Sequence, residues 1–160
     1  GYGSAAHEHG IFAIALASKA LETIIETAEE KRRGYVAGSC VADREVFQAA
    51  IVKAELRIKA ARLLMVDTSE RLFASACDAA APVALQAEAR AAAAHCTSEA
   101  LAVTTELIRY AGGSAVMSGH PLEKILRDLY TAQSHLFVSE SAYEILGRLR
   151  LGLTAKAPLS

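Results

Sequence analysis

The sequence predicts an all-α fold, an up-down four-helix bundle with a short additional C-terminal helix. Apolar residues recur at helical spacing over stretches much longer than a typical strand. The hydrophobic fraction is 52%, and much of it is alanine, whose small side chain suits closely packed helices. Glycine or proline interrupts the pattern at Gly34, Pro82, Gly112-Gly113 and Pro121. A chain of 160 residues has the length of one domain.

The first helix is expected from about Ala5 to Arg33. Apolar residues between Ile14 and Ala28 repeat at helical spacing, and charged residues take the opposite side. Basic residues close the segment, where they favour the C-terminus of a helix, and Gly34 then ends it.

The second helix is expected to have Asp43 as its N-cap and to reach about Ala80. Its inner stripe of apolar residues begins at Phe47 and persists over the whole segment. A helix of roughly 35 residues is roughly 50 Å long. Elements of that length are typical of helical bundles.

Pro82 suits the first turn of a third helix, which is expected to reach about Ala111. The run Ala91–Ala94 has two interpretations, because it lets a neighbouring helix come close or reflects helix propensity alone. Gly112-Gly113 ends the helix and also has two interpretations. It is a C-cap and turn, or a stretch of bare backbone that a flat or phosphate-bearing ligand approaches.

Pro121 is expected to begin the fourth helix, whose leucine stripe reaches Leu136. Ser139 or Ser141 is expected to cap the final helix, which ends near Gly152. This organisation makes residues 1–9 a frayed N-terminus, residues 10–152 the bundle, and residues 153–160 a C-terminal tail.

Charge and cysteine usage exclude several classes of protein. The net charge of −1 leaves no basic face for nucleic acid. The apolar run from Ile11 to Ala17 is too short to span a membrane and lacks the basic flank of a signal peptide. The odd count of three cysteines without metal-ligand spacing predicts buried thiols in a reducing cytoplasm. No Glu-x-x-His pair of the di-iron type occurs, so we predict no metal site.

The fourth helix carries a polar face opposite its leucine stripe. At 100° per residue this face holds Arg127, Asp128, Thr131, Ser134 and His135. One interpretation is a solvated outer surface, which such a face commonly forms. The other is the wall of a cleft in which His135 accepts or donates a proton.

The order of these features resembles the C-terminal helical domain of the acyl-CoA dehydrogenase superfamily. The strongest likeness is Gly112-Gly113, then seven residues, then the segment 121–128, Pro-Leu-Glu-Lys-Ile-Leu-Arg-Asp. Phe47-Gln48 and the run 60–64, Ala-Ala-Arg-Leu-Leu, add weaker support. The resemblance extends over roughly Gly10 to Gly152.

This resemblance implies a flavoprotein, with FAD or FMN as cofactor, that has further N-terminal and middle domains. The family forms homo-oligomers, so a dimer or tetramer is expected. The loop at Gly112 and Gly113 would approach the flavin of a neighbouring subunit. Phe47 and Gln48 match cofactor-contacting positions, and Arg33, or Arg32, stands in for an arginine on the diphosphate. The isolated 160-residue chain is expected to retain no flavin and to be inactive.

One departure from the family pattern favours a particular branch. Dehydrogenases of this family commonly place a catalytic glutamate where this chain has Leu136, which cannot take a proton. His135 stands one residue earlier, which is similar to flavin-dependent monooxygenases of this fold, enzymes that take reduced flavin from a separate reductase. His135 is then the catalytic acid or base. The alternatives are an acyl-CoA dehydrogenase with its base elsewhere and a non-catalytic helical oligomerisation module.

Overall fold

The computed structural model describes residues 2–34, 40–76 and 82–153, with side chains for all of them except residues 2–5, 31–34 and 76. Within these ranges the fold is all-α, as the sequence predicts. The α-helices are α1 (Tyr2–Gly34), α2 (Glu45–Ala76), α3 (Val83–Ile108), α4 (Pro121–Gln133) and α5 (Ser141–Arg150). Short 3-10 turns precede α2, α4 and α5, namely η1 (Val41–Asp43), η2 (Gly113–Val116) and η3 (Leu136–Val138).

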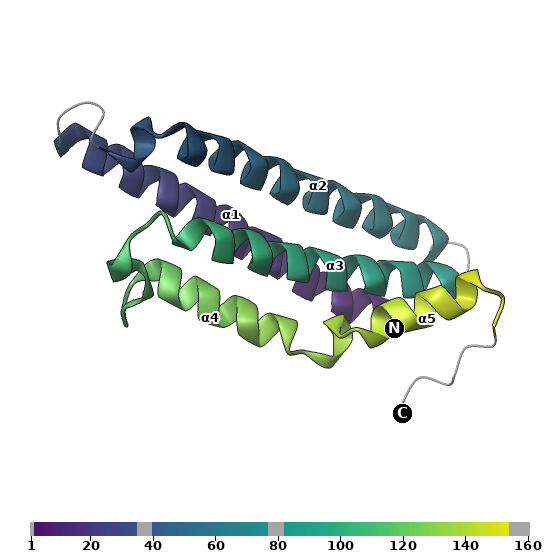
Figure 1. The fold of residues 1–160 in the computed structure, drawn as a ribbon. Helices are drawn as coiled ribbons and strands as arrows, with labels where there is room; N and C mark the ends of the chain where they lie inside the picture. Colours follow the sequence, from purple (N-terminus) through teal and green to yellow (C-terminus); the bar gives the residue numbers. More distant parts are fainter. Residues whose placement is uncertain (1, 35–39, 77–81, 154–160) are drawn as a thin grey trace.

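Helix α3 lies at the centre of the bundle (Figure 1). It packs against α1, α2, α4 and α5, while α1 also contacts α2 and α4. The N-terminal part of α1 and the turn η3 contact each other, so the start of the chain meets the connection between α4 and α5. This meeting point positions the candidate site.

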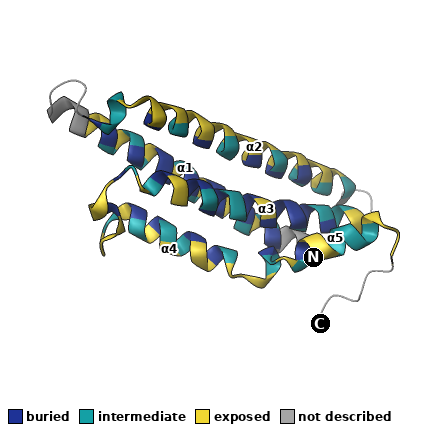
Figure 2. Cartoon of the chain, viewed as in Figure 1, coloured by how far each residue is buried: buried dark blue, intermediate teal, exposed yellow. Residues whose placement is uncertain are grey.

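Small side chains bring α1 and α3 close together. Ala13, Ala17 and Ala20 on α1 are fully buried. On α3 the whole run Ala91–Ala94 is buried, which supports the interpretation that it admits a neighbouring helix. Gly10 shows how tight the contact is, because a Cβ atom there would lie 3.2 Å from the Cα atom of Ala93. Buried residues face inward along these helices, whereas the outer side of α2 is exposed (Figure 2).

Helix boundaries differ from the sequence prediction at both ends of the site. Helix α1 begins at Tyr2, so residues 2–9, expected to fray, continue the helix, and Ala6 is fully buried. Helix α4 ends at Gln133, before the leucine stripe expected to reach Leu136. Leu136 lies in η3 instead and is 64% exposed.

The predicted helix caps are partly realised. Pro121 occupies the first turn of α4, as predicted, and the Nδ1 atom of His120 caps it by accepting a hydrogen bond from the Leu122 backbone N–H at 3.1 Å. Asp43 lies in η1 rather than at the N-cap of α2. The capping role expected of Ser139 or Ser141 is not seen, because α5 begins after Glu140 without a side-chain cap.

Two of the three cysteines lie within the described residues. Cys40 and Cys96 are buried, as predicted, and Cys77 lies outside the described part of the chain. The thiol of Cys96 donates to the Ala61 carbonyl at 3.3 Å, and burial, with a smaller contribution from Glu99, raises its pKa to about 12. No described helix is long and apolar enough to cross a membrane. In the same ranges, no three His, Cys, Asp or Glu side chains are grouped to hold a metal ion.

Candidate functional site

A cleft of about 360 Å³ lies between the N-terminal part of α1 and the C-terminal end of α4. Its lining comes from two segments far apart in the sequence: Glu8, His9 and Phe12 on α1, with Asp128, Thr131, Ala132 and His135 from the other side. Three of the five residues expected on the polar face of α4 therefore line it, namely Asp128, Thr131 and His135. This arrangement favours the cleft over a purely solvated face.

His135 reaches the cleft from beyond the end of α4. The helix closes at Ser134, whose backbone N–H donates to the Tyr130 and Thr131 carbonyls, each at 3.2 Å. His135 is then extended, with φ −77° and ψ 138°, and stands as the N-cap of η3. Its Nδ1 atom accepts a hydrogen bond from the Phe137 backbone N–H at 3.3 Å.

This hydrogen bond selects the tautomer of the His135 ring. An Nδ1 atom that accepts a hydrogen bond carries no proton, so the neutral imidazole holds its proton on Nε2. In this state Nε2 donates a hydrogen bond to a ligand.

His9 packs directly on His135. The two imidazole rings are stacked, with centroids 4.2 Å apart and 29° between their planes. Phe137 meets His135 at 4.9 Å and His9 at 6.2 Å, so three rings from α1 and η3 form one cluster. Burial lowers the pKa of His9 below its ordinary value of 6.5, the positive charge of His135 lowers it further, and Glu8 opposes both.

The remaining lining gives the cleft a mixed character. Phe12 offers a half-exposed ring, 48% accessible, while Glu8 and Asp128 contribute carboxylates from opposite walls. The Thr131 hydroxyl donates to the Arg127 carbonyl one turn earlier, at 2.9 Å. The cleft can therefore hold a molecule with a flat apolar part against rings and a polar group within reach of an imidazole.

The sequence analysis did not predict three of the residues that line the cleft, namely Glu8, His9 and Phe12. Residues 1–9 were expected to fray because the large apolar residues of the helical pattern begin only near Phe12 and Ile14. A signal is present in smaller residues, since Ala6, Gly10, Ala13 and Ala17 fall on one helical stripe, and all four are buried.

The residues predicted to bind flavin lie elsewhere. Phe47 is 5% exposed, and its ring packs edge-on against Tyr110 at 5.3 Å, so the ring belongs to the core. Gln48 is exposed, and its Nε2 atom donates to the Ala42 carbonyl at 3.1 Å. Phe47 lies in the same core cluster as Ala111, which precedes Gly112. The side chain of Arg33 lies outside the described residues.

Gly112 and Gly113 leave the backbone open at this end of the bundle. Both are exposed. Gly112 has φ +88°, which favours glycine, and a Cβ atom at Gly113 would meet nothing within 4 Å. The 13 residues of α4, about 20 Å at the standard rise, separate this loop from His135. The structure thus places the predicted flavin contacts and the predicted catalytic residue at opposite ends of α4.

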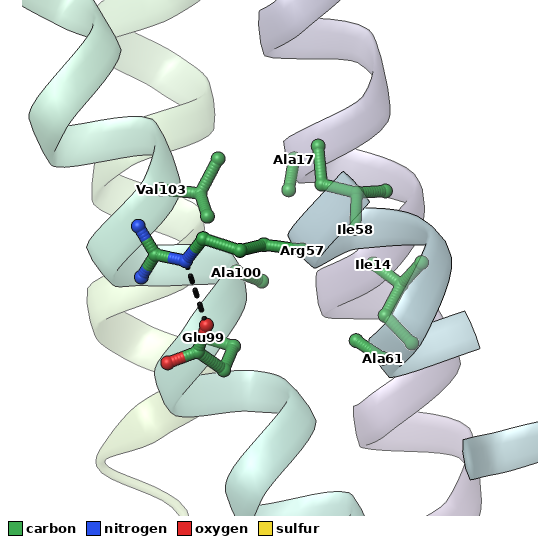
Figure 3. A pocket seen from close by; sticks show the side chains of 8 residues that line it. All are labelled: Ile14, Ala17, Arg57, Ile58, Ala61, Glu99, Ala100 and Val103. Carbon is green, nitrogen blue, oxygen red and sulfur yellow. Dashed lines mark hydrogen bonds and ion pairs between the residues drawn. The ribbon is translucent and has the colours of Figure 1, made fainter. Parts of the chain in front are cut away.

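A second depression, where α1, α2 and α3 meet, is a packed seam. Figure 3 shows the Arg57–Glu99 pair beside small and branched side chains, among them Ala17 and Ile58. The Arg57 Nε atom lies 2.9 Å from Glu99, and its Nη1 atom lies 2.8 Å from Glu106. The seam has no room for a water molecule, so it is a packed contact between the helices rather than a cavity.

Several solved structures share this fold. The chain superposes on 3-HSA hydroxylase from Rhodococcus sp. RHA1 with a TM-score of 0.85 at 22% identity, covering 99% of this chain and 40% of that one. For XiaF from Streptomyces sp., solved in complex with FADH2 and glycerol, the TM-score is 0.86 at 21% identity, with 99% and 41% covered. For the HsaA monooxygenase from M. tuberculosis the values are 0.83 and 22%, with 97% and 39% covered.

These structures are larger proteins, and this chain spans about two fifths of their length. A comparison with curated proteins found no match. A family model described as "Acyl-CoA dehydrogenase, C-terminal domain" matches residues 8–140, a range that includes every residue lining the cleft. The chain therefore belongs to the family of acyl-CoA dehydrogenase C-terminal domains.

Proposed function

We propose that this chain is the C-terminal bundle of a flavin-dependent monooxygenase in which His135 acts as the acid or base. The observation that carries the proposal is the position of His135, which lines a cleft and stacks on His9 at 4.2 Å. The solved structures with this fold include a hydroxylase, a monooxygenase and a nitroalkane oxidase, so a monooxygenase is compatible with the fold. Their low identity supports the fold alone, so the reaction rests on the site.

The residues at the cleft have different proposed roles. When bound, the reduced flavin supplies the electrons and the site of oxygen activation. In its neutral form His135 holds a proton on Nε2 and donates a hydrogen bond to a substrate oxygen. His9 and Phe137 pack on the imidazole and limit its rotation. Asp128 and Glu8 keep the opposite walls polar, and Phe12 orients the apolar part of the substrate.

The flavin itself would contact the other end of α4. Gly112 and Gly113 offer accessible backbone there, which fits the close approach of a flat group. Gln48 is exposed and matches a position that contacts the cofactor in the family. Arg33 would meet the diphosphate. Because His135 lies about 20 Å from this loop, the loop serves the flavin of a neighbouring subunit. The proposed flavin is FAD or FMN.

The decisive experiment uses the full-length enzyme with reduced flavin supplied by a reductase. Replacing His135 by Ala should lower the oxygenation rate roughly 100- to 10,000-fold, the usual contribution of a positioned acid or base. The matched control is Ser134→Ala, which changes the adjacent exposed residue outside the cleft lining. An unchanged oxygenation rate in His135→Ala would remove His135 from the mechanism. Turnover of acyl-CoA with an electron acceptor and no reductase would favour the dehydrogenase alternative.

Self-association is the second part of the proposal. The outer face of α2 exposes Val52, Leu56, Leu63 and Phe73, with Leu56 and Leu63 each 60% accessible. An apolar stripe of this kind along one helix marks an interface. The same observation supports the alternative of a non-catalytic oligomerisation module. The cytoplasmic location stays a prediction from the cysteine pattern, and the reductase and the further domains stay predictions from the family resemblance.

Sedimentation of the 160-residue chain tests self-association. We expect a dimer or tetramer at micromolar concentration, and the double variant Leu56→Gln, Leu63→Gln should shift it toward monomer. Leu151→Gln is the matched control, because Leu151 is 75% exposed but lies beyond α5. A strict monomer for the unmodified chain contradicts this part of the proposal.

A further inference from the structure

We propose that Arg90 is the positioning residue of His135, acting through the three hydrogen bonds that its guanidinium donates to η3 and to the start of α5. This inference rests on the proposed role of His135 and adds to it a residue on a third helix. Arg90 lies on α3, outside the lining of the cleft.

The turn η3 has little to hold it in place from within. It is a 3-10 turn of three residues between α4 and α5. Its backbone bond runs from the Val138 N–H to the His135 carbonyl at 3.1 Å. Val138 is buried and His135 stacks on His9, but Leu136 between them is 64% exposed. The carbonyls in the middle of the turn, those of Leu136 and Phe137, therefore need a further restraint.

Arg90 supplies this restraint. Its Nε atom donates to the Phe137 carbonyl at 3.1 Å, and Nη2 donates to the Leu136 carbonyl at 2.9 Å. The same Nη2 atom donates to the Ser141 hydroxyl at 3.1 Å. A planar guanidinium presents several donors in a fixed geometry, so one side chain holds two consecutive carbonyls and the first residue of α5.

The restrained carbonyls lie next to the bond that orients the ring. Phe137 receives the Arg90 Nε hydrogen bond at its carbonyl and donates its own N–H to His135 Nδ1. If Arg90 releases the turn, the Phe137 N–H can move away from Nδ1. The neutral His135 ring then loses its preference for the proton on Nε2 and exchanges between both tautomers.

The neighbouring charges on α3 do not duplicate this role. Glu88, two residues before Arg90 on α3, pairs with Arg71 at 2.8 Å and with Arg150 at 3.6 Å. Those pairs join α2 and α5 to α3. Among the described residues, the hydrogen bonds of Arg90 go to η3 and Ser141. Arg90 is thus the side chain of α3 that controls the turn carrying His135.

The test is nitrogen NMR of the His135 imidazole in the 160-residue chain, above the pH at which histidines titrate. In the unmodified chain the two ring nitrogens should give the well-separated shifts of a single tautomer with its proton on Nε2. In Arg90→Gln the two shifts should move toward each other. Arg62→Gln, which removes the same charge from an exposed site on α2, should leave both shifts unchanged.

Circular dichroism establishes whether Arg90→Gln is folded. A folded Arg90→Gln chain with unchanged His135 shifts overturns the proposal, and so does a tautomer mixture in the unmodified chain. If Arg90→Gln does not fold, Arg90→Lys decides, because it keeps the charge but lacks the planar fork. Converging shifts in folded Arg90→Lys support the proposal, and unchanged shifts overturn it.

The full-length enzyme provides a second readout. There Arg90→Gln should lower kcat by up to about 100-fold, with little change in KM, because a misplaced reacting group slows the chemical step. The catalytic role of His135 and the positioning role of Arg90 can be contradicted independently. If His135→Ala leaves oxygenation intact while Arg90→Gln still changes the nitrogen shifts, the proposed function is wrong and the positioning role stands.

Discussion

The imidazole of His9 on α1 stacks on that of His135, with ring centroids 4.2 Å apart. At this separation a proton on one ring disfavours a proton on the other. Burial lowers the pKa of His9 most, and the charge of His135 lowers it further. Replacing His135 by Gln should therefore raise the pKa of His9 while leaving it below 6.5, because the effect of burial persists.

An NMR titration of the 160-residue chain measures this change. His120→Gln is the matched control, since His120 caps α4 through its Nδ1 atom as His135 caps η3, but lies at the other end of α4. An identical pKa of His9 in the unmodified chain and in His135→Gln would show that the rings do not stack in solution.

The same burial makes the stability of the fold sensitive to acid. The pKa values of His7 and His9 are both lowered, mainly by burial, below 6.5. The unfolded chain therefore binds protons at these positions more readily than the native chain. Stability should be constant above about pH 7, should fall as the pH drops through 6.5, and should stop falling from this cause below the native pKa values.

Thermal unfolding between about pH 7 and about pH 5 checks this dependence. The double variant His7→Gln, His9→Gln should lose less stability over this range than the unmodified chain. His95→Gln serves as the control, because His95 is exposed on α3. Equal losses in the double variant and the unmodified chain would assign the acid sensitivity to other groups.

Gly10 lies at a tight contact between α1 and its neighbours α2 and α3. A Cβ atom there would lie 3.0 Å from the Met65 Sδ atom and 3.2 Å from the Ala93 Cα atom. Met65 is 1% exposed, so its side chain has little room to move. Overpacking should outweigh the helix propensity of alanine, and Gly10→Ala should destabilise the fold by about 1 kcal/mol.

Gly147 in α5 provides the matched control for Gly10. It is also helical, but a Cβ atom there would meet nothing within 4 Å. Gly147→Ala should therefore stabilise the fold by up to about 1 kcal/mol through helix propensity. Denaturant unfolding of both variants compares the two effects. If Gly10→Ala gains as much stability as Gly147→Ala, α1 and α3 lie further apart than the structure has them.

The helices could be predicted because the spacing of their apolar residues and the positions of glycine and proline indicate the same segments. Pro121 begins α4 as expected, since a proline in the first turn sacrifices no helical hydrogen bond. The start of α1 could not be predicted from large apolar residues, because its buried stripe there consists of Ala6 and Gly10. Such residues are small, and they are buried only because α2 and α3 cover them.

The sequence predicts His135 as a site residue, but the structure brings its ring to the cleft in a different way. The prediction placed it on the polar face of a continuing helix, yet α4 ends at Gln133 and the ring reaches the cleft from the extended backbone before η3. Its partners could not be predicted at all. His9 meets it only because the first turns of α1 pack on η3, and Arg90 binds that turn from a separate helix.

The leucine stripe of α4 offers a direct test of where the helix ends. Leu129 is fully buried in the core, and Leu136, one heptad later and expected on the same stripe, is 64% exposed in η3. Leu129→Ala should therefore cost about 2–5 kcal/mol of unfolding free energy, through lost burial and the cavity that remains. Leu136→Ala should change it by less than about 0.5 kcal/mol. Denaturant unfolding of both variants gives the comparison, and equal losses would mean that α4 continues to Leu136 and buries its side chain with the rest of the leucine stripe.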